Sequence, residues 1–202
     1  MKEYPKIPNS VQFPLSQCYA FEKLDGSNLR FLYTHKNGFC RFGTRKQLFD
    51  KTHEVFGSAI DIFKNKYEQS LINIFSKDFK QYKEITVFAE FVGPNSFAGK
   101  HLFTDKKDIV MFDIWLHKYG LIGPEQFIKT FSHLNIAKLV WQGKFNGKFA
   151  DDVRKGKYKV NEGVVCKAGT GGNDLVMCKI KTNAYMEKLK ITFNKDWEQF
   201  WE

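Results

Sequence analysis

The chain reads Phe21-Glu22-Lys23-Leu24-Asp25-Gly26-Ser27-Asn28, with residues that favour β-strands on both sides of this stretch. A lysine amine is a nucleophile only when it is neutral, and its usual pKa of about 10.4 keeps it charged in water. Burial or neighbouring cations lower that pKa and make the amine reactive. Because Gly26 permits a tight turn, the stretch predicts a strand that ends at Lys23 beside a bound ligand. By itself it also fits an ordinary strand-to-turn junction on the surface.

The composition favours one folded domain with a polyanionic partner. The chain has 202 residues, of which 43% are hydrophobic and 16% aromatic, so we expect a substantial core. The 32 Lys and Arg residues exceed the 22 Asp and Glu residues, which gives a net charge of +10. This charge suits nucleic acid or nucleotide, through attraction and counterion release. A basic surface that serves only solubility is the alternative.

No segment resembles a targeting or membrane signal. Residues 1–10 lack the apolar centre of a signal peptide, and no apolar run is long enough to span a membrane. The cysteines form no CxxC pair and have no zinc spacing, although Cys166 and Cys178 are placed to face each other across a hairpin. We therefore expect a cytoplasmic monomer with reduced thiols and no membrane partner.

The hydrophobic pattern mixes strands with helices. Strands are predicted at 19–23, 29–33, 39–42, 85–92, 108–116, 159–167 and 175–181, and helices within 52–79, from Gly123-Pro124, within 146–157 and at 182–190. Asn37-Gly38 is a strong hairpin signal. Residues 169–173 are glycine-rich, but they lack the Lys-Ser/Thr and helix of a phosphate-binding loop, so we interpret them as a hairpin loop.

Five segments carry the remaining chemical signals, and their order and spacing matter more than any one of them. They are Lys23-Leu24-Asp25-Gly26, Phe88-Ala89-Glu90-Phe91, Val110-Met111-Phe112-Asp113-Ile114, Glu162-Gly163-Val164-Val165-Cys166-Lys167 and Lys179-Ile180-Lys181. Together they resemble the motif series of the covalent nucleotidyltransferases, which comprise ATP-dependent DNA ligases, RNA ligases and mRNA capping enzymes. The resemblance implies an α+β ligase-type adenylyltransferase fold, with antiparallel sheets flanked by helices around a nucleotide pocket.

The resemblance also implies a role for each motif residue. Lys23 would be the catalytic nucleophile, Glu90 would bind the ribose, Phe112 would stack on the purine, and Glu162 would serve a divalent metal, Mg²⁺ or Mn²⁺. The nucleotide would also contact Glu22, Asn28, Arg45, Lys179 and Lys181, while Asp25 would shape the pocket. The two lysines would neutralise phosphate charge and lower the pKa of Lys23 by repulsion.

Each role has a simpler alternative. An acidic residue such as Glu90 inside an apolar strand is costly unless it faces a ligand, but it could instead pair with a lysine. Phe112 could be ordinary core. Lys179 and Lys181 alternate along a strand and therefore share one face, as they would on a solvated sheet.

The implied reaction is ATP-dependent polynucleotide ligation. Lys23 would take AMP from ATP and pass it to a 5′-phosphate, and a 3′-OH would then displace AMP and close a nick in duplex DNA or in an RNA–DNA hybrid. Such an enzyme would serve DNA or RNA repair. The alternatives are a capping-type guanylyltransferase, and a non-catalytic nucleic-acid-binding protein with a degenerate nucleotide site.

Within that group the chain is most similar to the RNA ligases that seal nicks. Asn28 supports this similarity, because DNA ligases usually carry arginine at that position. Asp25 speaks against it, because the RNA-sealing branch often has histidine there. Only 21 residues follow Lys181, so we expect residues 1–202 to form a single minimal adenylation domain without an OB-fold domain. Contacts to nicked duplex are expected from basic residues near the nucleotide and on the tail helix, namely Arg41, Arg45, Lys46, Lys188 and Lys190.

Overall fold

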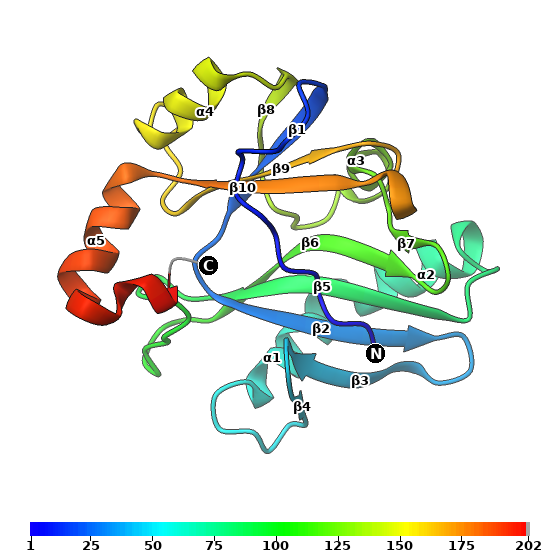
Figure 1. The fold of residues 1–202 in the computed structure, drawn as a ribbon. Coiled ribbons are helices and arrows are strands. Elements are labelled where there is room, and N and C mark those ends of the chain that lie inside the picture. The colour runs from blue at the N-terminus through cyan, green and yellow to red at the C-terminus, as the bar shows by residue number, and fades with distance from the viewer. Residues whose placement is uncertain (201–202) are drawn as a thin grey trace.

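Two antiparallel sheets face each other in the computed structural model, which describes residues 1–200 (Figure 1). The four-stranded sheet has the order β10-β9-β1-β8, formed by Val176–Lys181, Gly163–Ala168, Gln17–Lys23 and Leu139–Lys144. The six-stranded sheet has the order β4-β3-β2-β5-β6-β7, formed by Leu48–Phe49, Gly38–Thr44, Ser27–Thr34, Glu84–Val92, Asp108–Leu116 and Gly120–Leu121. The chain passes from one sheet to the other immediately after Lys23. The expected α+β fold class is confirmed.

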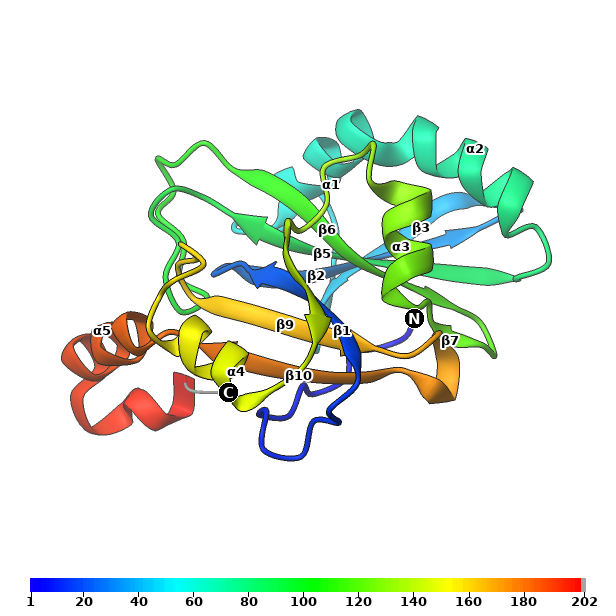
Figure 2. The ribbon, with the colours of Figure 1, turned by 90° about the horizontal axis from the view of Figure 1, so that it is seen from above.

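Helices cover the outer face of the six-stranded sheet (Figure 2). They are α1 (Gly57–Phe63), the π-helical segment η1 (Lys64–Glu68), α2 (Gln69–Asp78) and α3 (Pro124–Phe131). The helical pattern expected from residue 52 onward therefore begins only at Gly57. Its buried residues recur every four positions, at Phe63, Tyr67, Leu71, Phe75 and Phe79, which is wider than the 3.6-residue turn of an α-helix. The wider π-helical turn keeps Tyr67 directed toward the core.

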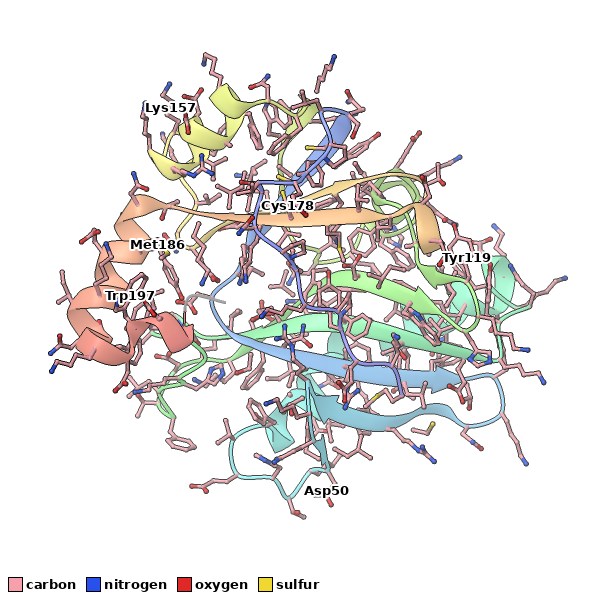
Figure 3. The ribbon with its side chains drawn as sticks, viewed as in Figure 1. Asp50, Tyr119, Lys157, Cys178, Met186 and Trp197 are labelled. Atoms are coloured by element: carbon pink, nitrogen blue, oxygen red, sulfur yellow. The ribbon has the colours of Figure 1, made fainter. Side chains whose placement is uncertain are left out.

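A second core lies on the other side of the four-stranded sheet, under α4 (Gly147–Arg154). Asn146 caps α4 by accepting a hydrogen bond from Phe149 N, the local reason that the helix starts there. Figure 3 shows Cys178 midway along β10, where it pairs in register with Cys166 as the sequence suggests. Both thiols are free and buried.

The 3₁₀ segment η2 (Gly172–Asp174) lies between β9 and β10. After β10 follow the helix α5 (Asn183–Phe193) and a second 3₁₀ segment, η3 (Asn194–Phe200). No helix of residues 1–200 is long and apolar enough to cross a membrane. The structure departs from the sequence-based expectations in its strands. The strands β4, β7 and β8 were not predicted, and β9 begins at Gly163 instead of residue 159.

The N-terminal segment, residues 1–9, runs across the space between the sheets in front of β2 and β10 (Figure 1). Arg30 Nη1 donates to Met1 O at 3.3 Å, which attaches one end of the segment to β2. Lys179 N donates to Pro8 O at 2.9 Å, which attaches the other end to β10. The segment therefore links both sheets and forms one wall of the space between them.

Candidate active site

A cavity of about 620 Å³ lies between the two sheets. Most of the predicted site residues line it, namely Glu22, Lys23, Asn28, Arg45, Lys46, Glu90, Phe112 and Lys179. These residues come from both sheets and from segments far apart in the chain. The fold therefore brings the motif series together around one space large enough for a nucleotide.

Three residues form a row across the four-stranded sheet at one edge of the cavity. Gly163 on β9 pairs with Lys23 on β1 and with Lys181 on β10, so both lysines project from the same face with no side chain between them. Glu162, the residue before β9, is buried between the two amines. Its carboxylate lies 2.8 Å from Lys23 Nζ and 3.0 Å from Lys181 Nζ.

This arrangement corrects one expectation about Lys23. Burial lowers the pKa of Lys23, but the charges of Glu162, Glu90 and Asp25 raise it by more. The pKa of the Lys23 amine is therefore above its ordinary value in this structure, not below it. The repulsion expected from the lysine pair is outweighed by a carboxylate that sequence spacing could not place beside the amine.

Glu90 and Asn28 lie opposite each other on β5 and β2. Burial raises the pKa of Glu90 to about 8, with the charges of Glu162 and Asp25 acting in the same direction and Lys23 opposing. Among the described residues, the buried Oδ1 of Asn28 has no hydrogen-bond partner. A buried polar atom that lacks a protein partner and faces a cavity is suited to a ligand.

Phe112 forms the aromatic end of the cavity. Tyr4 packs edge-on against it with ring centroids 5.1 Å apart, and Phe88 lies beyond at 6.4 Å. Lys167 Nζ donates a hydrogen bond to Phe112 O at 2.8 Å. It also lies 2.7 Å from Asp113 Oδ1, close enough for an ion pair, although the angles at Asp113 Oδ1 do not fit a hydrogen bond. Burial lowers the pKa of Lys167 and raises that of Asp113.

The sequence analysis missed Tyr4 and Lys167 as cavity residues. Lys167 ends the quoted fourth motif, and its position on the same face as Gly163 was the available signal. Tyr4 precedes every predicted strand, and no local pattern places it beside Phe112.

Asp25 holds the turn that follows Lys23, and its role in shaping the pocket stays a prediction. Its Oδ1 accepts a hydrogen bond from Ala98 N at 2.8 Å, and the Tyr185 hydroxyl also bonds to the carboxylate. Asp25 thus connects the turn after Lys23 to the loop of residues 93–107 and to α5. Gly26 is required in this turn, because a Cβ there would lie 2.3 Å from Phe91 O.

Three of the predicted nucleic-acid residues lie away from the cavity. Arg41 is exposed on β3, opposite Leu32. Lys188 Nζ lies 3.9 Å from the ring centroid of Phe97, and Lys190 pairs with Glu187 at 2.7 Å. These residues belong to the surface around the site, and their contact with nucleic acid stays a prediction.

A divalent cation would find one carboxylate here, not a complete protein cage. No three acidic, histidine or cysteine side chains within residues 1–200 are grouped to hold a metal. Mg²⁺ is usually held by one or two carboxylates together with phosphate oxygens and water. Glu162 at the edge of the cavity fits that kind of site, provided that the cation and the lysine amines share its oxygens.

Comparison with known proteins gives a family and a fold. Residues 16–181 match the model of the family described as RNA ligase. An RNA ligase mutant from Naegleria gruberi with ATP and Mn is similar at a TM-score of 0.63 and 16% identity, over 86% of this chain and 52% of that chain. The same ligase with PPi matches at 0.63 and 17%, over 88% and 52%. An archaeal ATP-dependent RNA ligase matches at 0.66 and 15%, over 98% and 53%.

At these identities the structural matches show the fold. The chain spans about half the length of the ligases that it matches. No curated protein matches the sequence.

Proposed function

The chain belongs to the RNA ligase family, and from that premise we propose that it is an ATP-dependent ligase that works through a lysyl-AMP intermediate. The observation that carries the proposal is the position of Lys23. Its amine is held by Glu162 at the edge of a cavity whose other walls supply Glu90 and the aromatic ring of Phe112. A nucleotide with its base on Phe112 and its ribose on Glu90 would present its phosphates toward Lys23.

The first step forms a bond between Lys23 Nζ and the α-phosphorus of ATP and breaks the bond to pyrophosphate. Because the pKa of Lys23 is raised, the ammonium must first lose a proton, and a second N–H proton leaves after the attack. Lys179 and Lys181 come from one strand and would stabilise the charge that develops on the phosphates. The Naegleria ligase has been solved with ATP and Mn, which supports ATP as the nucleotide.

We assign the divalent cation, Mg²⁺ or Mn²⁺, to Glu162 together with phosphate oxygens. When bound, it would neutralise phosphate charge and orient the leaving pyrophosphate. Occupation of the Glu162 carboxylate by a cation would also weaken the attraction that keeps Lys23 protonated.

The later steps transfer AMP from Lys23 to a 5′-phosphate, after which a 3′-OH attacks that phosphate and releases AMP. The family supports RNA as a substrate, and we extend the proposal to nicks in duplex RNA, RNA–DNA hybrids or DNA. We further propose that residues 1–202 act as one adenylation domain and as a monomer.

The first test is formation of the covalent adduct. Incubation with ATP and Mg²⁺ should raise the mass of the protein by one AMP, and Lys23→Ala should abolish the adduct because the nucleophile is gone. Lys36→Ala, at the exposed tip of the β2–β3 hairpin, is the matched control and should react normally. A GMP adduct formed in preference to AMP would favour the capping alternative instead.

The second test is a sealing panel. Nicked duplexes in which each strand is RNA or DNA should be offered to the wild type and to Lys23→Ala, with the joined product measured on a gel. Adduct formation without sealing of any duplex would restrict the proposal to adenylation.

A further inference from the structure

The motifs do not account for a hydrogen-bonded group beside the cavity. Ser27 Oγ lies 2.8 Å from His101 Nε2, and Ser96 Oγ lies 3.1 Å from His101 Nδ1. Gly93 N donates to Ser96 Oγ at 2.8 Å. These hydrogen bonds link the backbone of the β5–β6 loop to Ser27. Ser27 lines the cavity.

The histidine is held in place and is neutral at ordinary pH. Its ring centroid lies 5.1 Å from that of Phe91 and 6.0 Å from that of Phe56. Burial lowers the pKa of His101, Lys107 acts in the same direction and Asp105 opposes it. A neutral imidazole has one donor nitrogen and one acceptor nitrogen. His101 can therefore accept a hydrogen bond from one serine and donate a hydrogen bond to the other.

The contacts favour one direction. Ser96 already accepts from Gly93 N, so its own O–H can donate to His101 Nδ1. The imidazole N–H then lies on Nε2 and donates to Ser27 Oγ. Within residues 1–200, this leaves the Ser27 O–H with Gly99 O as its protein acceptor, at 3.4 Å, a distance at the weak end of the hydrogen-bond range. The Ser27 hydroxyl is therefore available to donate to an acceptor in the cavity.

The position of Ser27 indicates which acceptor. Ser27 pairs with Phe91 on β5, and Asn28 pairs with Glu90, one position closer to Phe112. Because adjacent residues of a strand point to opposite faces, the Ser27 side chain lies on the face of Phe91 and His101, at the end of β2 where Ser27 and Phe56 also line the cavity. Arg45 and Lys46, which follow β3, line the same cavity. They add positive charge to the end of the six-stranded sheet, whereas Lys23, Lys179 and Lys181 come from the four-stranded sheet.

Two groups of basic residues therefore flank the cavity, one from each sheet. We propose that Ser27, held by His101 and Ser96, donates a hydrogen bond to the 5′-phosphate of the nucleic-acid acceptor, which Arg45 and Lys46 attract. The lysines of the four-stranded sheet take the phosphates of the nucleotide. The inference rests on the proposed ligase function and adds a residue that recognises the acceptor end. His101 and Ser96 are positioning residues, because they act through Ser27.

The test compares binding of two nicked RNA duplexes that differ only in a 5′-phosphate or a 5′-hydroxyl at the nick. For each variant, one sample is incubated with ATP and Mg²⁺ and its AMP adduct is measured by mass. A second sample without ATP and Mg²⁺, in which no AMP transfer or sealing proceeds, gives the Kd for each fluorescent duplex. The wild type should prefer the 5′-phosphate. Ser27→Ala should lose about ten- to a hundredfold of that preference, as expected for a hydrogen bond to a charged group.

Conservative variants separate recognition from loop anchoring. Ser27→Thr keeps the hydroxyl and His101→Gln keeps an N–H donor at a similar reach, so both should retain the preference. His101→Ala should lose part of it.

An unchanged preference in Ser27→Ala, or its loss in Ser27→Thr and His101→Gln as much as in the alanine variants, would overturn the inference. A wild type without any preference would overturn it too. If the wild type forms no AMP adduct, the ligase proposal fails, yet the ratio of the two Kd values across the variants still decides the role of Ser27.

Discussion

The two lysines of the last motif lie two positions apart on β10 and differ in their surroundings. The Lys181 side chain is only 6% exposed and shares Glu162 with Lys23, whereas Lys179 lines the cavity. Either alanine substitution should slow adduct formation by roughly 10²–10³-fold, the effect of removing one donor to a transition state. From the sequence alone, both lysines were expected to contact the nucleotide, with a solvated sheet face as the alternative.

The structure predicts a difference in stability between these variants. Lys181→Ala leaves a buried carboxylate with one fewer partner, which should lower the free energy of unfolding by about 1–3 kcal/mol, while Lys179→Ala should change it little. Urea unfolding measures the stability, and the rate of mass increase measures the chemistry. Equal stability of the two variants would show that the Glu162–Lys181 pair contributes nothing to the fold.

Glu90 gives a prediction about pH. Burial raises its pKa to about 8 in the folded protein, whereas an unfolded chain has a value near 4.3. Between these values the folded state binds a proton that the unfolded state does not, so the free energy of unfolding should fall as pH rises from about 4.5 to 8. Each unit of difference corresponds to about 1.4 kcal/mol. Glu90→Gln should remove this part of the decline.

Unfolding of both proteins at pH 5, 7 and 9 provides the check. Glu84→Gln, at the other end of β5, is the matched control and should follow the wild type. Parallel curves for Glu90→Gln and the wild type would mean that Glu90 is ionised in the folded protein at neutral pH.

The sequence predicted the identity of the site residues better than their electrostatics. Motif order is sufficient to group Lys23, Glu90 and Phe112. The ionisation of Lys23 depends on a carboxylate 139 positions away, and the role of Ser27 depends on a histidine 74 positions away. Neither distance in space can be read from residue types, because the first is set by the register of β1 against β9 and the second by the path of the loop that joins β5 to β6.

At the level of elements, Gly163 decides how the site is assembled. It has a φ of +156°, and a Cβ on it would lie 2.0 Å from Ile180 O. Gly163→Ala should therefore separate β9 from β10, displace Glu162 and cost about 1–3 kcal/mol or more. Adduct formation should fall with it.

Gly147→Ala provides the comparison, since a Cβ at that position meets nothing within 4 Å. Circular dichroism melting and the AMP-adduct rate would be recorded for both glycine variants. Normal activity and stability of Gly163→Ala would show that β9 can shift without moving Glu162.

Elements with regular alternation or strong local signals were predictable. Examples are the hairpin at Asn37-Gly38 and the helix that starts at Pro124. The strand β8 was missed because Gly143 and a mostly exposed, weakly alternating pattern give little signal. Its strand state comes from pairing with β1, and tertiary pairing of this kind overrides local propensity.

For the whole molecule, the net charge of +10 should dominate affinity for nucleic acid. Binding to a nicked duplex should weaken steeply with salt, with a slope of log K against log salt of about −0.9 per phosphate contacted. Because phosphates are common to DNA and RNA, mixed strands should be tolerated.

Variants at the basic residues localise these contacts. Arg45→Ala and Lys46→Ala should each reduce the slope by about one. The slope should fall less in Lys188→Ala and Lys190→Ala, because the Lys188 amine contacts Phe97 and the Lys190 amine pairs with Glu187. The slope of Arg41→Ala tests whether the exposed face of β3 contacts phosphate. A shallow slope for the wild type, or sealing confined to one kind of duplex, would show that specific contacts govern substrate choice.

The position of β1 between β8 and β9 has a consequence for how the chain folds as it is synthesised. The strand that ends at Lys23 is synthesised well before either of its neighbours, because both lie beyond residue 138. Contacts between such distant segments carry a large loop-closure cost and form slowly. Until then β1 exposes two unpaired edges and the side chain of Phe21. We therefore expect truncated chains that stop before β8 to aggregate or to engage chaperones, whereas chains that reach Lys181 can close the sheet and complete the site in a single late step.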